Sequence, residues 1–264
     1  MSDISPKLAE FYRRLRDNDP SLISLDLQYK KIGDIGMQHL SQALQFNSSL
    51  TRLNLRSNRI GDAGAQHLAT VLQSSSSLTE LDLFYNGIGD AGAQHLAIAL
   101  QSNTSLTILC LGCNKIQEVG ARHLATALQF NSSLIYLNLS GNRIGNVGAQ
   151  HLAAALRVNS SLIELYLDSN EIKEEGAQHL GTALQFNSSL THLNLYANQI
   201  KETGARYLLE TLQFNSSLSF LNLAFNYISD ETNTFLFQIR KRNFHNERLR
   251  SLTLQDVLLE RCSF

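Results

Sequence analysis

The fold is decided by residues 50–77, LTRLNLRSNRIGDAGAQHLATVLQSSSS, a stretch of 28 residues that returns along the chain with small changes. The leucine that opens it recurs at a constant spacing of 28 residues. A fixed period of this size is the signature of a repeat architecture, in which each unit packs against its neighbours. The opening leucines are Leu22, Leu50, Leu78, Leu106, Leu134, Leu162, Leu190 and Leu218.

Each unit combines a strand pattern with a helix pattern. It begins L-x-x-L-x-L-x-x-N-x-I, and its alternating leucines have the period of a β-strand. Further along, Ala65, Leu68, Ala69 and Leu72 stand at i, i+3, i+4 and i+7, which gives one apolar stripe on a helix. Asp62 precedes this stripe, and we expect it to cap its own helix. The predicted unit is therefore strand, turn, helix and loop.

Stacking these units predicts an α/β solenoid. A single unit buries too little apolar surface to offset the entropy of ordering its residues, so neighbours must cover one another. Neighbouring strands lie about 4.8 Å apart, whereas packed helices need about 8–10 Å. The stack must therefore curve, with a parallel sheet on the concave face and helices on the convex face.

These motifs resemble a known family. The strand motif followed by GDAGAQHLATVLQ is similar to the leucine-rich repeats of the ribonuclease-inhibitor class, and most of all to the C-terminal repeats of NOD-like receptors. The resemblance covers residues 22–245 and implies a horseshoe. It also implies that the Asn at the ninth position of each repeat bonds to backbone along the turn. That role is carried over to Asn58, Asn86, Asn114, Asn142, Asn170, Asn198 and Asn226, while Lys30 takes the position in repeat one.

The resulting domain organisation has three parts. Residues 1–21 are expected to form an N-terminal helical cap, with a helix over 5–17. Residues 22–245 form eight repeats of 28 residues, and residues 246–264 form a capping strand and tail, because LRSLTL (249–254) repeats the strand signature. A solenoid needs caps of this kind because its terminal repeats expose core surface.

Composition and charge exclude several classes of function. The chain has 264 residues and a formal net charge of −1, so it lacks the strong positive field that attracts nucleic acid or anionic membranes. Its three cysteines are too few for a disulfide framework. The chain starts without an apolar signal-peptide core, and no stretch approaches the roughly 18 apolar residues of a membrane helix. We expect a cytoplasmic monomer that binds neither nucleic acid nor membrane.

The word LQFNSSL occurs four times and contains an N-glycosylation pattern. Looser versions of the word bring the number of such patterns to six. Because they recur with the repeat, we interpret them as structural corners and not as glycan acceptors. The six asparagines are Asn47, Asn103, Asn131, Asn159, Asn187 and Asn215.

Histidines and cysteines raise the question of a metal site. Six histidines share one helix position, but Tyr207 and Phe235 take it in repeats seven and eight, so we interpret it as a packing slot for a flat ring. Cys110 and Cys113 form a C-x-x-C pair, but zinc needs four ligands and the only other cysteine is Cys262. We predict no catalytic residue, cofactor or metal. The histidines are His39, His67, His95, His123, His151 and His179.

The varied positions of the strand predict a binding surface. The third, fifth and seventh residues of each repeat point away from the buried leucines, onto the concave face. In repeats five to eight they carry aromatic and acidic side chains, a composition typical of protein-binding hot spots. Aromatic residues also favour strands for packing reasons alone. The predicted protein-binding residues, centred on one patch formed by the rings of Tyr166 and Tyr196, are Tyr136, Glu164, Tyr166, Asp168, His192, Tyr196, Phe220, Phe225 and Tyr227.

We therefore predict a non-enzymatic module that binds a protein partner on its concave face. It would act as an adaptor, or as an effector that an intracellular bacterium secretes into the host cytosol. The alternative is a GTPase-activating protein of the Ran type, which has a similar horseshoe. That family typically ends in a long acidic tail, whereas this chain ends in RKRNFHNERLRSLTLQDVLLERCSF.

Overall fold

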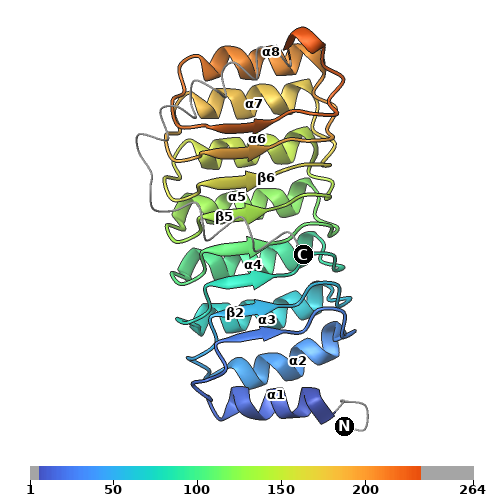
Figure 1. Ribbon diagram of the computed structural model, residues 1–264, viewed down its shortest axis with the longest axis vertical. Helices are drawn as coiled ribbons and strands as arrows, with labels where there is room; N and C mark the ends of the chain where they lie inside the picture. Colours follow the sequence, from blue (N-terminus) through green and yellow to red (C-terminus); the bar gives the residue numbers. More distant parts are fainter. Residues whose placement is uncertain (1–5, 233–264) are drawn as a thin grey trace.

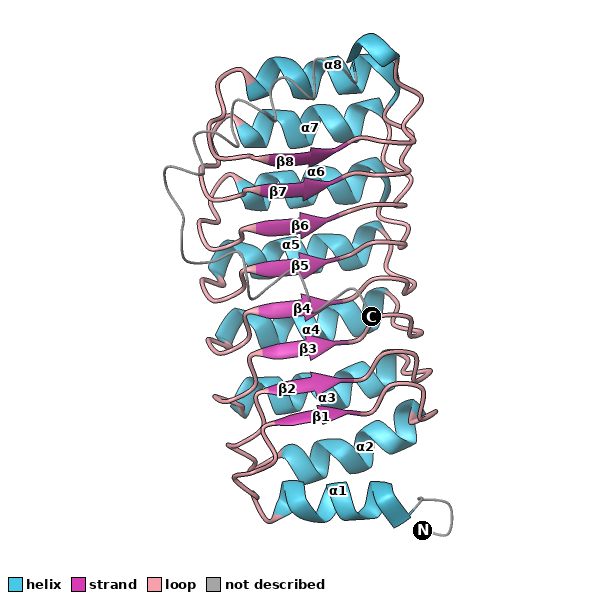
Figure 2. Ribbon diagram, in the orientation of Figure 1, coloured by secondary structure: helices cyan, strands magenta, loops and turns pink. Residues whose placement is uncertain are grey.

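The computed structural model describes residues 6–232 and shows one parallel sheet backed by one layer of helices (Figures 1 and 2). Its eight strands follow one another in chain order. Every strand pairs with the residue 28 positions away, so Leu53 aligns with Leu25 on one side and Leu81 on the other. The strands are β1 Ser24–Asp26, β2 Arg52–Asn54, β3 Glu80–Asp82, β4 Ile108–Cys110, β5 Tyr136–Asn138, β6 Glu164–Tyr166, β7 His192–Asn194 and β8 Phe220–Asn222.

The helices alternate with the strands and run side by side behind the sheet (Figure 2). This arrangement is the α/β leucine-rich-repeat horseshoe that the sequence predicts, with the sheet on the concave face and the helices on the convex face. The helices are α1 Pro6–Arg16, α2 Gly33–Leu44, α3 Asp62–Ser74, α4 Asp90–Ser102, α5 Glu118–Phe130, α6 Gly145–Leu156, α7 Glu174–Leu184 and α8 Lys201–Leu212.

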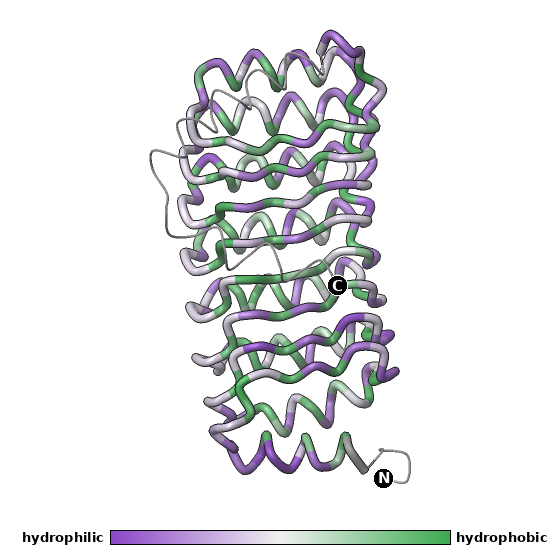
Figure 3. Tube along the Cα trace, viewed as in Figure 1, coloured by the Kyte–Doolittle hydropathy of each residue, from purple (hydrophilic) through white to green (hydrophobic). Residues whose placement is uncertain are grey.

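One continuous apolar core fills the space between the two layers. Each repeat contributes its strand leucines, the isoleucine of the turn and the apolar stripe of its helix, as Leu53, Leu55, Ile60, Leu68 and Leu72 do in repeat two. All five are almost completely buried. The exposed face of the helices is mostly polar, although Ile35, Ile98 and Val147 are exposed on it, and the tube alternates between hydrophobic and hydrophilic colours along the helices (Figure 3).

Two rows of asparagine side chains tie neighbouring repeats together. At the ninth position, Asn58 donates from Nδ2 to the Leu27 carbonyl at 2.8 Å, and its Oδ1 accepts from the Ile32 N–H at 3.3 Å. At the FNSSL corner, Asn131 donates from Nδ2 to the Leu100 carbonyl at 2.8 Å. Both asparagines therefore satisfy backbone groups of the preceding repeat, which buried backbone requires.

The helix caps differ from the prediction. Asp62 forms no cap bond with its own helix, whose N-cap residue is Gly61. Its Oδ1 instead accepts from the N–H groups of Gly89 and Gly92, at 2.6 and 2.9 Å, at the start of the next helix. Its own helix is capped in the same way by Asp34 of repeat one. The expectation that Asp62 caps its own helix was wrong, because the stacking offset brings the carboxylate closer to the following repeat.

This cap also explains why glycine is the third residue of α4. A Cβ on Gly92 would lie 2.6 Å from Oδ1 of Asp62 and 2.8 Å from Cγ2 of Ile88. Such distances leave no room for a side chain, so only glycine permits the carboxylate to reach the helix N-terminus.

The N-terminal end of the stack is covered by α1. Leu15 and Tyr12 of this helix are buried against the first repeat, and Leu8 and Phe11 pack at the edge of the same core. Residues 233–264 lie outside the described residues, and so do Phe235 and the strand and tail predicted over 246–264.

Candidate functional site

The fifth strand position has a structural role that sequence reasoning missed. The Oδ1 of Asn54 accepts from the Arg56 N–H at 3.0 Å, and that of Asp82 accepts from the Phe84 N–H at 2.7 Å. Asn194 makes the same bond to the residue two positions later. Local bonds of this kind are typical of Asn and Asp at turns. The signal was present in the sequence, because Asn or Asp fills this position in all repeats except those with Cys110 and Tyr166.

Charged residues occupy the concave face of the N-terminal repeats. The Arg56 guanidinium lies over the Phe84 ring, 4.3 Å from its centroid, in a cation–π contact. Burial raises the pKa of the Asp82 carboxyl, although Phe84 and Arg56 counteract this shift.

Two of the predicted tyrosines pair on the concave face of β5 and β6. The ring centroids of Tyr136 and Tyr166 are 5.1 Å apart, and Tyr166 donates its hydroxyl to Oε2 of Glu164 at 3.2 Å. Tyr136 is only 5% exposed and Glu164 only 7% exposed. In the structure as described, these two side chains offer little surface to a partner, while Tyr166 is partly exposed.

Two further ring pairs lie on β7, β8 and their rim. The rings of His192 and Phe220 stack with centroids 5.5 Å apart. The rings of Tyr196 and Phe225 are tilted, with centroids 4.9 Å apart. Tyr227, which follows on the rim, is 80% exposed. Repeats seven and eight therefore present an accessible aromatic surface.

The two central tyrosines of the predicted patch, Tyr166 and Tyr196, each contact a different ring. The register places Tyr166 of β6 opposite Asn194 of β7, two residues before Tyr196. Tyr166 pairs with Tyr136, and Tyr196 pairs with Phe225. Asp168 lies between them and accepts from Nδ2 of Asn194 at 3.1 Å. Burial raises the pKa of Asp168. The predicted residues thus divide into a partly buried group on β5 and β6 and an accessible group on β7 and β8.

The histidine position lies between adjacent helices on the convex side. Tyr207 occupies it in α8, and a Cβ on Gly181 of α7 would lie 3.1 Å from the Tyr207 ring. The hydroxyl groups of Thr182 and Tyr207 are 3.3 Å apart. Among residues 6–232, no three His, Cys, Asp or Glu side chains gather closely enough to hold a metal ion.

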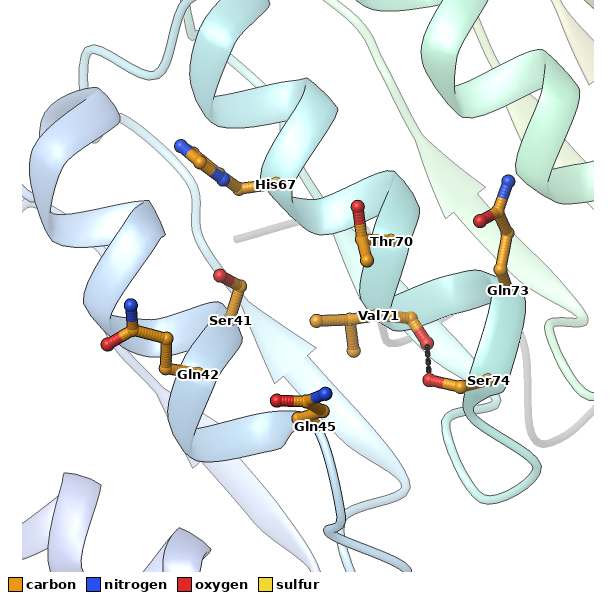
Figure 4. Close-up of a pocket in the computed structure, with 8 residues that line it drawn as sticks. All are labelled: Ser41, Gln42, Gln45, His67, Thr70, Val71, Gln73 and Ser74. Atoms are coloured by element: carbon orange, nitrogen blue, oxygen red, sulfur yellow. Dashed lines mark hydrogen bonds between the residues drawn. The ribbon is translucent and has the colours of Figure 1, made fainter.

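A hollow lined mainly by polar side chains lies between the neighbouring helices α2 and α3, with a volume of about 450 Å³ (Figure 4). His67 lies at one end of it, and Ser74 at the other end donates to the Val71 carbonyl at 3.2 Å. Its remaining lining is serine, threonine and glutamine, with Ser41 facing the hollow from α2. These neutral side chains do not form a set for acid–base or nucleophilic chemistry.

The C-x-x-C pair lies at the end of β4. Cys110 is buried, and burial together with the charge of Asp168 raises the pKa of the Cys113 thiol. A raised pKa disfavours the reactive thiolate. In the part of the chain that the structure describes, no helix is long and apolar enough to cross a membrane.

A comparison with known protein families agrees with this architecture. A family described as "Leucine Rich repeat" matches six segments of the sequence. No curated protein matches the chain. Among solved structures, the chain is similar to "Leiomodin-1 Actin-Binding Site 2 (ABS2)", with 18% identity, a TM-score of 0.49, and coverage of 71% of this chain and 91% of that one. It is also similar to the tropomodulin C-terminal domain of Caenorhabditis elegans, with 15% identity, a TM-score of 0.34, and coverage of 92% and 96%. The matched segments are residues 46–69, 74–97, 102–125, 130–153, 158–181 and 186–209.

Proposed function

This chain belongs to the leucine-rich-repeat family, and from that premise we propose that it is a non-enzymatic module that binds a protein partner on its concave face. The partner docks on the C-terminal aromatic surface, which we define as His192, Tyr196, Phe220, Phe225 and Tyr227. Solenoids of this type typically use their extended concave surface for binding.

The observation that carries the proposal is the accessible pairing of Tyr196 with Phe225 beside the stacked rings of His192 and Phe220. Phe225 is 74% exposed, although a phenylalanine gains nothing from contact with water. Aromatic residues held on a rigid face are enriched in binding hot spots, because they lose little conformational entropy on binding. The acidic neighbour Asp168 would orient a basic group of the partner.

The test is affinity capture from eukaryotic cytosol with two matched variants. Truncating a central interface aromatic typically costs about 2 kcal/mol or more, which is roughly thirtyfold in affinity. Tyr196→Ala with Phe225→Ala should therefore lose a specific captured protein. The control is Phe46→Ala with Phe130→Ala, because these rings are 83% and 69% exposed but lie at the opposite edge of the solenoid. Both variants should melt at the wild-type temperature.

The proposal fails if both variants and the wild type capture the same proteins in the same amounts. The roles of cytosolic adaptor and secreted effector stay hypotheses, since both only require such a surface. The alternative function, GTPase activation, is tested by adding the protein to candidate GTPases and measuring GTP hydrolysis. A stimulated rate would replace the binding-module proposal.

A further inference from the structure

A row of cations follows one edge of the solenoid, where the chain leaves each strand and turns toward its helix. The tenth residue of repeats one, two, four and five is Lys31, Arg59, Lys115 and Arg143, and all four side chains are exposed. Among the ion pairs of residues 6–232, none involves these four residues. This is the edge beyond the arrowheads of the strands in Figure 1, and it is coloured as hydrophilic next to β1 and β2 in Figure 3.

The row lines a hollow with a volume of about 670 Å³. Lys31, Arg59 and Lys115 contribute to its walls, together with Tyr29 and Tyr85. The two tyrosines are 65% and 64% exposed.

The hollow stays open in its middle because the tenth residue of repeat three, Gly87, has no side chain. A Cβ there would lie 3.4 Å from the Ile60 carbonyl oxygen, in ordinary contact. A larger residue would therefore fit at this position, and its side chain would fill the space between the cations of repeats two and four.

Three negative charges of this edge are engaged at helix N-termini. Asp34 also lines the hollow, but its Oδ1 accepts from the N–H groups of Gly61 and Gly64 and so compensates the positive end of α3. Asp62 and Asp90 do the same for the next two helices. The four cations face outward, and the same edge also exposes Lys30 in repeat one and Glu118 in repeat four. In repeats six, seven and eight the tenth residue is Glu171, Gln199 and Tyr227, so the cationic row ends there.

We propose that this edge binds an acidic, extended peptide segment of a partner protein. Its carboxylates pair with Lys31, Arg59, Lys115 and Arg143, and Tyr29 and Tyr85 pack against its apolar atoms. Side chains on one face of an extended peptide recur about every 7 Å. That distance lies between the spacing of strands and the spacing of helices, so carboxylates on one face of the peptide keep step with the repeats, and one carboxylate passes over Gly87 of repeat three without a cation. A single row of cations on a chain of net charge −1 fits a peptide better than nucleic acid, which calls for a broad basic surface.

This second surface is separate from the C-terminal aromatic surface, so the two proposals stand or fall independently. The test measures fluorescence anisotropy of a labelled peptide of eight glutamates at low salt. Lys31→Glu with Arg59→Glu should weaken binding about tenfold or more, because two ion pairs are replaced by repulsion. The control is Arg16→Glu with Arg122→Glu, which makes the same change in net charge at exposed cations of α1 and α5 outside the row and should alter affinity less than twofold. Circular dichroism verifies that each variant folds.

If the reversed pair does not fold, the neutral pair Lys31→Gln with Arg59→Gln replaces it, with an expected loss of about threefold. Binding in the wild type should also weaken as salt is raised, since exposed pairs are screened. The proposal is overturned if the wild type does not bind the peptide, or if the two charge reversals weaken binding equally. It is also overturned if an eight-nucleotide single-stranded DNA binds as tightly as the peptide.

Discussion

At the scale of single residues, the asparagine of the FNSSL corner shows how one side chain serves two repeats. The Nδ2 of Asn131 donates to the carbonyls of Leu100 and Asn103, at 2.8 and 3.0 Å. Its Oδ1 accepts from the Leu134 N–H at 2.8 Å, so the same amide closes the loop into the next strand. The side chain is 5% exposed. The nitrogen that would carry a glycan is therefore buried and engaged, which supports a structural role for all six corners.

Removing this amide should destabilise the fold. We expect Asn131→Ala to lower the free energy of unfolding by about 1–3 kcal/mol, because the Leu100 carbonyl and the Leu134 N–H lose their partner while buried. Ser132→Ala is the matched control, since that side chain is exposed and should change stability by less than about 0.5 kcal/mol. Urea unfolding measures both variants. Equal stabilities would show that the corner amide contributes nothing.

Glu202 supplies a pH-dependent contribution at the C-terminal end of the described chain. Its carboxylate accepts from the Thr232 hydroxyl at 2.5 Å, the Ser229 N–H at 2.9 Å and Nε of Arg206 at 2.9 Å. These bonds, the one from Thr232 foremost, lower the pKa of Glu202 from 4.5 to about 2. A depressed pKa in the folded state means that the charged form stabilises the protein above pH 4.5, and that this contribution is lost as the pH falls toward 2.

We expect Glu202→Gln to be less stable than the wild type at pH 6, with a difference that shrinks as the pH falls from 4.5 to 2. Unfolding in urea at pH 6, 4 and 3 checks this expectation. Glu210→Gln serves as the control, because Glu210 is an exposed glutamate of the same helix. A gap between wild type and Glu202→Gln that stays constant at all three pH values would refute the assignment.

At the scale of elements, helix capping passes from one repeat to the next. Asp34, Asp62 and Asp90 each accept from two N–H groups at the start of the following helix. Asn146 does the same for α7 through the N–H groups of Lys173 and Gly176. Helix N-termini leave such N–H groups without a partner in their own helix. Each helix is therefore completed by its neighbour, which couples the folding of adjacent repeats.

Comparison of two acidic residues at the same helix position tests this coupling. Asp62 and Glu118 are each the first residue of their helix, but only Asp62 bonds to the next helix among the described contacts. We expect Asp62→Ala to cost about 1 kcal/mol, as loss of a helix cap does, and Glu118→Ala to cost at most a few tenths. Asp62→Asn should retain most of the stability, since Asn146 forms the same bonds. Thermal melting of the three variants checks the order, and equal melting temperatures for the two alanine variants would contradict it.

At the scale of the whole molecule, the period of 28 was sufficient to predict the fold. Because every strand pairs in register with the residue 28 positions away, the position of a leucine in its repeat determines its place in the core. Contacts that depend on the offset between layers could not be predicted in this way. Asp62 bonds to the start of the next helix, because the displacement between neighbouring repeats brings its carboxylate there. Sequence spacing does not contain that displacement.

The same periodicity predicts which deletions the molecule tolerates. Removing residues 106–133 joins Ser105 to Leu134, which reproduces the native Ser133–Leu134 junction. Asn159, which donates to the Leu128 carbonyl, would then find the Leu100 carbonyl in the equivalent place. The interface between the remaining repeats keeps its leucines, corner amides and helix caps in register. We therefore expect a folded protein with the same helical signal per residue.

This deletion should lower the m-value of urea unfolding by roughly one-eighth, because the m-value scales with the surface that unfolding exposes and one repeat of eight is lost. Removal of residues 106–119 alone is the control. It removes half a repeat and joins Ser105, just before a strand, to Gly120 inside α5. Every later residue shifts by half a period, so Leu134 no longer aligns with the leucine of the preceding repeat. We expect that variant to lose its helical signal and its cooperative transition. If both deletions fold equally well, the fold does not depend on the rows of corner asparagines and capping carboxylates that connect the repeats. The stabilising roles proposed for Asn131 and Asp62 would then be wrong.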